Sequence, residues 1–92
     1  MNIRFHIDPK TGEPHIYEHG VIEDEVRQVL ARPGDDFPSS GNSRIAYGRT
    51  WDGRHLQVVY VRNAPDDMFV VTAYDLKGKT LKAYRRRRRK GK

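Results

Sequence analysis

Apolar and polar residues alternate at the start of the chain. Ile3, Phe5 and Ile7 are separated by polar residues, which is the two-residue period of a strand with one buried face. The segment Asp8-Pro9-Lys10-Thr11-Gly12 follows, and its Pro and Gly favour a turn. We therefore expect a short strand that ends in a turn.

A helical period comes next. The apolar stripe of a helix with 3.6 residues per turn is formed by Ile22, Val26, Val29 and Leu30. Acidic residues 23–25 lie in its first turn, where they compensate the helix dipole, and Pro33-Gly34 ends it. Residues 15–19 form at most one helical turn before Gly20. Residues 34–42 have the composition of a loop.

The clearest local pattern is a β-hairpin. Residues 43–51 and 54–62 resemble strands, and Asp52-Gly53 between them is typical of a two-residue type I′ turn. In that register Tyr47 lies opposite Val58. The aromatic and aliphatic face that contains this pair is the one we expect the helix to cover.

A third run, residues 68–74, has the β-branched and aromatic residues of a central strand. Strands that follow one another so closely form antiparallel meanders. The fold class predicted is therefore α+β, with an antiparallel four-stranded sheet and one or two helices packed on one face.

Charge divides the chain into two parts. It contains 18 Lys and Arg against 12 Asp and Glu, with a formal net charge of +6. All the acidic residues precede Leu76, and the segment from there to Lys92 is basic. We predict one domain, residues 1–78, and a basic C-terminal arm, residues 79–92. The arm should be helical to about Tyr84 and disordered beyond it, because adjacent arginines repel one another.

Some classes of protein are excluded by composition. The chain has no Cys, so disulfides, thiolate metal sites and cysteine nucleophiles are excluded. The first residues lack the apolar run that is typical of a signal peptide, and no apolar run is long enough to cross a bilayer. We expect a cytoplasmic protein without a cofactor.

An ordered set of short motifs resembles a known group of proteins. The set comprises Phe5-His6-Ile7-Asp8-Pro9, His19-Gly20-Val21, Tyr47-Gly48-Arg49-Thr50, Val58-Val59-Tyr60-Val61 and Val71-Thr72-Ala73-Tyr74. It is similar to small bacterial domains of unassigned function that neighbour the BrnT-like toxins in the RelE/ParE superfamily. The resemblance implies a RelE/ParE-like fold, metal-independent endoribonuclease activity on messenger RNA, and a cognate antitoxin protein as partner. Ile22, where a hydroxyl cap is expected, and the run Arg85–Arg89 depart from the group.

The resemblance also implies catalytic residues on the sheet. Arg44 and Arg49 are the candidates for stabilising charge on the scissile phosphate, and His55, Tyr74 or Tyr84 for proton transfer. Of these, His55 titrates closest to neutral pH. An exposed strand histidine without a function is the alternative.

The basic arm is the candidate RNA-binding segment. Its residues are Lys82, Tyr84, Arg85, Arg86, Arg87, Arg88, Arg89 and Lys90. Such a segment binds phosphates by releasing counterions, and its tyrosine can stack on unpaired bases. A binding module without catalysis is the alternative function, and an arm that only solubilises, or that meets acidic lipid or an acidic partner, also fits. A third possibility, by resemblance to the gyrase-poisoning branch, is a protein inhibitor.

One further motif matches a metal-site signature. Residues 15–19 read H-x-x-E-H, which in zinc hydrolases requires both histidines on one face of a stable helix and a third ligand. Pro14 and Gly20 leave barely one turn, and no third ligand is evident. We therefore expect no metal site.

Overall fold

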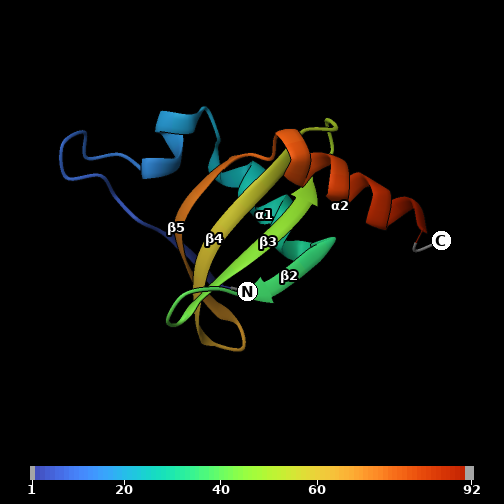
Figure 1. Ribbon diagram of the computed structural model, residues 1–92. Coiled ribbons are helices and arrows are strands. Elements are labelled where there is room, and N and C mark those ends of the chain that lie inside the picture. Colours follow the sequence, from blue (N-terminus) through green and yellow to red (C-terminus); the bar gives the residue numbers. More distant parts are fainter. Residues whose placement is uncertain (1, 91–92) are drawn as a thin grey trace.

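The computed structural model describes residues 2–90, with side chains to residue 89 (Figure 1). Along the chain it has β1 (Asn2–Phe5), a 3₁₀ helix η1 (His15–His19), α1 (Glu23–Ala31), β2 (Asp35–Pro38), β3 (Ser43–Arg49), β4 (His55–Ala64), β5 (Asp67–Asp75) and α2 (Gly78–Lys90).

The strands form one five-stranded sheet in the order β1-β5-β4-β3-β2. Strands β2 to β5 pair antiparallel, whereas β1 pairs parallel with β5. The α+β class is confirmed, but the prediction of four antiparallel strands was wrong. It placed the residues of β2 in a loop, and it did not foresee the parallel pair. That pair is possible because the chain between the two strands is long: it passes through η1, α1 and strands β2 to β4 before β5 runs beside β1 in the same direction.

Helix α1 covers one face of the sheet and contributes Val26, Val29 and Leu30 to the core. The sheet side of this core consists of Ala46, Leu56, Val58, Tyr60, Met68, Val70 and Ala73. The helix approaches β3 closely at Gly48, where a Cβ atom would lie 2.8 Å from Cγ1 of Val29. A glycine at this position therefore allows the helix to touch the strand.

Helix α2 lies on the other face of the sheet, in front of β3 and β4 in Figure 1. Its Tyr84 is buried, and the ring centroid lies 6.0 Å from that of Tyr47 and 5.9 Å from that of His55. A Cβ atom on Gly34 would overlap the hydroxyl of Tyr84. The prediction placed one or two helices on a single face of the sheet, whereas α1 and α2 lie on opposite faces.

The register of the hairpin differs from the prediction by one residue. His55 pairs with Arg49, and Tyr47 pairs with Gln57 rather than Val58. The turn has three residues, because Thr50 N–H donates to the carbonyl of Arg54 (2.8 Å). The Thr50 hydroxyl accepts the Arg54 N–H in return (3.1 Å).

This shift changes which side chains face which helix. A shift of one residue moves a side chain to the opposite face of its strand. Ala46 and Gly48 therefore face α1, whereas Ile45 and Tyr47 lie on the face that α2 crosses. The prediction that Tyr47 belongs to the face under the first helix was wrong.

Arg54 connects the start of α1 to the sheet. Its guanidinium donates to Asp75 Oδ1 (2.7 Å), Glu25 Oε1 (3.1 Å) and the carbonyl of Gly20 (2.8 Å). This contact lowers the pKa of the Asp75 carboxyl. Glu25 also accepts the N–H of Ile22 (3.1 Å), which is half of a capping box and compensates in part for the missing hydroxyl.

Candidate nucleic-acid interface

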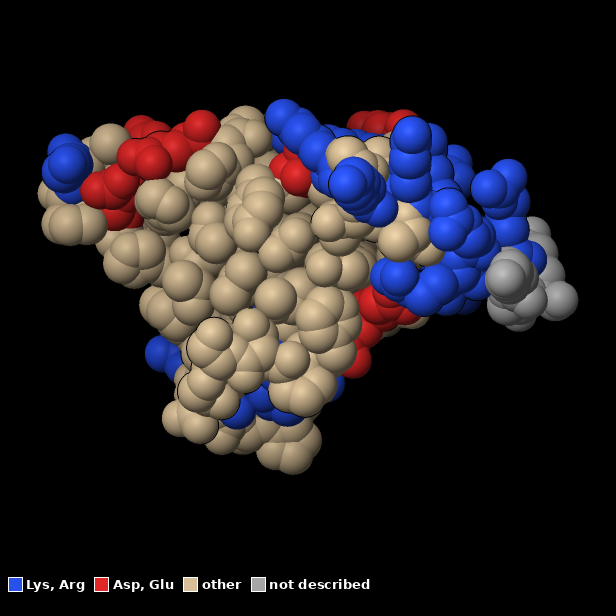
Figure 2. Space-filling model, viewed as in Figure 1, with Lys and Arg blue, Asp and Glu red and all other residues tan. Residues whose placement is uncertain are grey.

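A cationic groove lies between α2, the β3–β4 turn and the end of α1. Its volume is about 740 Å³, and it is lined by Arg32, Gly34, Arg49, Gly53, His55, Tyr84, Arg85, Arg88 and Arg89. In Figure 2 the basic side chains gather over α2, beside a sheet face with few charges. Acidic side chains gather at the opposite corner, over the segment that contains η1.

His55 is the titratable group of this groove closest to neutrality. It begins β4, lies opposite Arg49 on β3, and packs edge-on against Tyr84. Partial burial lowers the pKa of its imidazole, and the charges of Arg85 and Arg49 lower it further. The imidazole is therefore neutral at pH 7 and able to accept a proton.

Some arginines of the molecule pair with carboxylates of the described residues, whereas those of the groove do not. Arg44, Arg54 and Arg87 each pair with a carboxylate, at N–O distances of 3.0, 2.7 and 2.6 Å. Within residues 2–89, whose side chains the structure describes, no ion pair involves the groove arginines, which are Arg32, Arg49, Arg85, Arg88 and Arg89. Their positive charge is therefore available to a polyanion.

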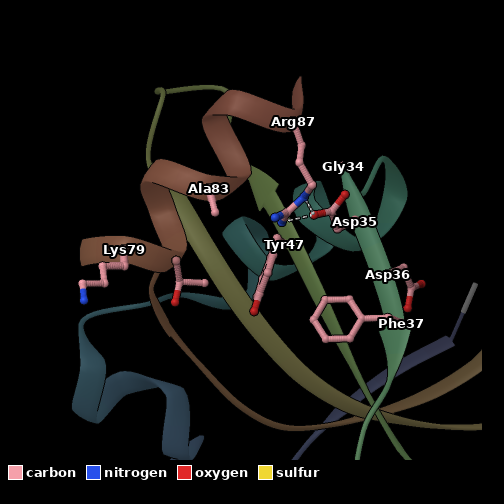
Figure 3. Close-up of a pocket in the computed structure, with 9 residues that line it drawn as sticks. Gly34, Asp35, Asp36, Phe37, Tyr47, Lys79, Ala83 and Arg87 are labelled. Carbon is pink, nitrogen blue, oxygen red and sulfur yellow. Dashed lines mark hydrogen bonds and ion pairs between the residues drawn. The ribbon is translucent and has the colours of Figure 1, made fainter. Parts of the chain in front are cut away.

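Two polar contacts join the end of α2 to the start of β2. Arg87 points away from the groove and pairs with Asp35, in a neighbouring hollow of about 770 Å³ (Figure 3). Arg88 donates to the carbonyl of Gly34 (3.3 Å). The helix runs to Lys90, beyond Tyr84, where we expected order to end. These contacts offset part of the repulsion along the arginine run.

The structure brings together some of the predicted residues. Of the catalytic candidates, His55 and Arg49 lie in the groove, and Tyr84, Arg85, Arg88 and Arg89 of the arm line it with them. Lys82 and Arg86 are exposed on α2 outside the lining. The side chain of Lys90 is outside the described residues.

The other two catalytic candidates lie elsewhere. Arg44 is on the strand face opposite Arg49 and donates to Asp36 (3.0 Å), which raises the pKa of its guanidinium. The Tyr74 hydroxyl accepts the side-chain amide of Gln57 (2.9 Å), and its ring lines a separate hollow near η1. Neither side chain shares a site with His55.

Sequence reasoning missed part of the groove. Arg32 was not among the predicted site residues, because its proximity to α2 depends on tertiary contacts that no local pattern shows. Trp51 is 84% exposed on the turn, two residues before Gly53 in the groove. Trp51 is exposed because it is one of the three residues of this turn. The Asp52-Gly53 pattern alone does not distinguish a three-residue turn from a two-residue turn, so the sequence did not predict this exposure.

Comparisons with known proteins found no family model, no curated protein and no solved structure that matches this chain. Among residues 2–90, no helix is both long and apolar enough to span a bilayer.

Proposed function

We propose that this protein binds single-stranded RNA in the cationic groove and cleaves it without a metal ion, with His55 as the general base. The observation that carries the proposal is a neutral imidazole among five arginines that have no carboxylate partner within the described side chains. General-base catalysis needs a neutral imidazole, and binding of a phosphodiester backbone needs positive charge that no carboxylate neutralises.

The chemistry follows from this arrangement. The imidazole of His55 removes the proton of a ribose 2′-hydroxyl, and the 2′ oxygen attacks the adjacent phosphorus. The P–O5′ bond breaks, and the 5′ oxygen takes a proton from water in the open groove. The products are a 2′,3′-cyclic phosphate and a 5′-hydroxyl. Arg49 and Arg85, whose charges act on His55, stabilise the negative charge that develops on the phosphoryl oxygens.

Trp51 provides a stacking surface beside this site. An exposed indole on a turn that borders a cationic groove is suited to an unpaired base, and such stacking contributes about 1–3 kcal/mol per base. This feature favours single strands over duplexes, because bases in a duplex stack on one another. The BrnT-like and RelE/ParE-like resemblance is consistent with the same substrate, and it adds a cognate antitoxin and a cytoplasmic location to the proposal.

A second candidate function is RNA binding without cleavage. It is favoured by the environment of Tyr84, whose hydroxyl is buried against Gly34 and whose pKa is raised by that burial. This hydroxyl cannot readily reach a leaving group, so His55 would act without a second acid-base side chain from the groove lining. RNA binding through the groove arginines and Trp51 requires no proton transfer, so it would persist without catalysis.

Binding is tested by salt titration with a short single-stranded RNA. Contact with about five phosphates predicts a slope near −3.5 in a plot of log affinity against log salt. Arg85→Ala or Arg88→Ala should reduce the steepness of the slope by about 0.7. Arg27→Ala, which removes an exposed arginine of α1, is the matched control and should leave the slope unchanged. An affinity independent of salt contradicts the whole proposal.

Cleavage is tested separately with the same RNA. His55→Ala should lower the cleavage rate by about 100-fold or more, with the affinity changed little, and a 2′-deoxy substitution at the cut site should abolish the reaction. His19→Ala, at an exposed histidine outside the groove, is the control. Binding without cleavage by the unmodified protein would favour the second function.

A further inference from the structure

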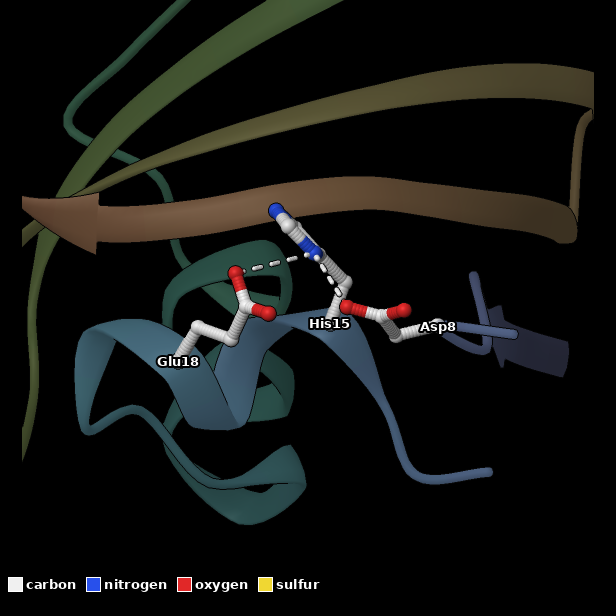
Figure 4. Close-up of side chains that lie close together, drawn as sticks. All are labelled: Asp8, His15 and Glu18. Atoms are coloured by element: carbon white, nitrogen blue, oxygen red, sulfur yellow. Dashed lines mark ion pairs between the residues drawn. The ribbon is translucent and has the colours of Figure 1, made fainter. Parts of the chain in front are cut away.

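A cluster of side chains at the other end of the molecule has the geometry of a metal site. Asp8 lies in the turn after β1, and His15 and Glu18 lie in η1. One potential ligand atom from each residue falls within 4.8 Å of the other two. Figure 4 shows the imidazole of His15 directed between the two carboxylates. These residues take no part in the groove, so the inference is independent of the proposed function.

The 3₁₀ conformation of η1 decides which residues meet. Side chains three positions apart are nearly eclipsed in a 3₁₀ helix, whereas in an α-helix those four apart also share a face. His15 is therefore aligned with Glu18, and His19 is not a member of the cluster. The third ligand that the H-x-x-E-H motif lacked is Asp8, supplied from outside the motif.

The distances fit a bound cation better than a network of hydrogen bonds. Nδ1 of His15 lies 3.6 Å from Oδ2 of Asp8 and 3.5 Å from Oε2 of Glu18, which is long for a hydrogen bond. Ligands at about 2.1 Å from a tetrahedral zinc ion lie about 3.4 Å from one another. The two distances are close to that spacing.

Asp8 is held in position by its own turn. One carboxylate oxygen, Oδ1, accepts the backbone N–H of Lys10 (2.9 Å). Its carbonyl accepts the N–H of Gly12 (2.8 Å). Oδ2 faces His15 and has no hydrogen bond among the described residues, although Asp8 is only 8% exposed. Because the Asp8 side chain keeps 11% of its surface exposed and Oδ2 accepts no hydrogen bond from the described part of the chain, this oxygen is available to a cation.

We propose that Asp8, His15 and Glu18 bind one Zn²⁺ ion through Oδ2, Nδ1 and Oε2, with water at the remaining position. An imidazole nitrogen with two carboxylates, at this small spacing, favours zinc over Mg²⁺ or Ca²⁺, which prefer six or more oxygen ligands. The ion also neutralises the repulsion between the two carboxylates, and it fastens the turn after β1 to η1.

Calorimetric titration of the full chain with Zn²⁺ tests this proposal. One ion should bind per chain, and Mg²⁺ should bind at least about 100-fold more weakly. Asp8→Asn, His15→Ala and Glu18→Gln should each weaken Zn²⁺ binding by about tenfold or more. His19→Ala, the neighbouring imidazole, should change the affinity by less than about twofold.

Glu18→Gln keeps the test interpretable, because this side chain is half exposed and its substitution should not disturb folding. A second readout is Co²⁺, whose visible absorption should appear with the unaltered protein and disappear in His15→Ala. Absence of saturable Zn²⁺ binding overturns the proposal. So does a Glu18→Gln variant that binds normally, or a His19→Ala variant that loses as much affinity as His15→Ala.

Discussion

Helices α1 and α2 lie on opposite faces of the same sheet, and different forces hold them. Helix α1 buries three apolar side chains and is part of the hydrophobic core. Helix α2 buries Tyr84, while Leu81 and Ala83 are only half-buried, and it adds the ion pair between Arg87 and Asp35. One helix is therefore a component of the fold, and the other is an arm docked on it.

The comparison explains why the groove and the docked helix depend on each other. The arginines that face the groove repel one another, and this repulsion opposes the docking of α2. A bound polyanion relieves it, so ligand binding should stabilise α2 in its present position. The following predictions test the difference between the two helices, starting with the largest effect.

Tyr84→Ala should release α2 without unfolding the sheet. Loss of a buried aromatic ring costs about 3 kcal/mol, which corresponds to a decrease of about 100-fold in the hydrogen-exchange protection of α2. Amides of β4 should keep their protection, and RNA affinity should fall. Tyr17→Ala, at an exposed tyrosine, is the control. Equal loss of protection in α2 and β4 would show that α2 is also part of the core.

Gly48→Ala should destabilise the whole domain, because the new Cβ atom meets Val29 at 2.8 Å. We expect a loss of about 2 kcal/mol in the free energy of unfolding, measured by urea denaturation. Val29→Ala alone should also destabilise. In the double variant the added methyl occupies space that the valine leaves, so the loss should be smaller than the sum of the two. Additive losses would contradict the close approach of α1.

Arg87→Ala should have a smaller effect, below about 1 kcal/mol, because the Arg87 side chain is 52% exposed. The loss should appear as weaker hydrogen-exchange protection of α2, and it should shrink at high salt. Arg86→Ala is the matched control, since Arg86 has no carboxylate partner within the described side chains. Equal effects of the two variants at low salt would exclude a role for the ion pair.

The smallest effect concerns the pH dependence of stability. Burial and the nearby arginines lower the pKa of His55 below its ordinary value of 6.5, so the unfolded chain binds more protons in the interval between the two values. Stability should therefore fall as the pH drops below 6.5. His55→Gln should remove that part of the dependence, as measured by thermal unfolding across the interval. An unchanged pH profile would show that the groove does not perturb His55.

Local patterns predicted those parts of the fold that local forces determine. Val26, Val29 and Leu30 of the apolar stripe predicted α1 and its buried side correctly, whereas Ile22 precedes the helix as its N-cap and is 54% exposed. The hairpin was predicted, but its register was not. An Asp-Gly pair also occurs in three-residue loops, and here the contact between Thr50 and Arg54 selects the longer form.

Long-range contacts determined what sequence analysis missed. Strand β2 is polar and is recognisable only from its pairing with β3. The face chosen by α2 depends on the open space above Gly34, which a side chain there would fill. His55 and Arg49 were identified as candidates, but Arg32 joins them only because α1 ends beside α2. Asp8, the third residue of the cluster that contains His15 and Glu18, likewise lies outside the H-x-x-E-H motif, in the turn after β1.

The two outer strands of the sheet have a consequence for self-association. Strands β1 and β2 have four residues each, and β2 carries two aspartates and ends at Pro38. An exposed strand edge can recruit another chain, and short length, charge and proline all hinder that. The short length of both strands, together with the charge and the proline of β2, therefore opposes edge-to-edge association of the sheet.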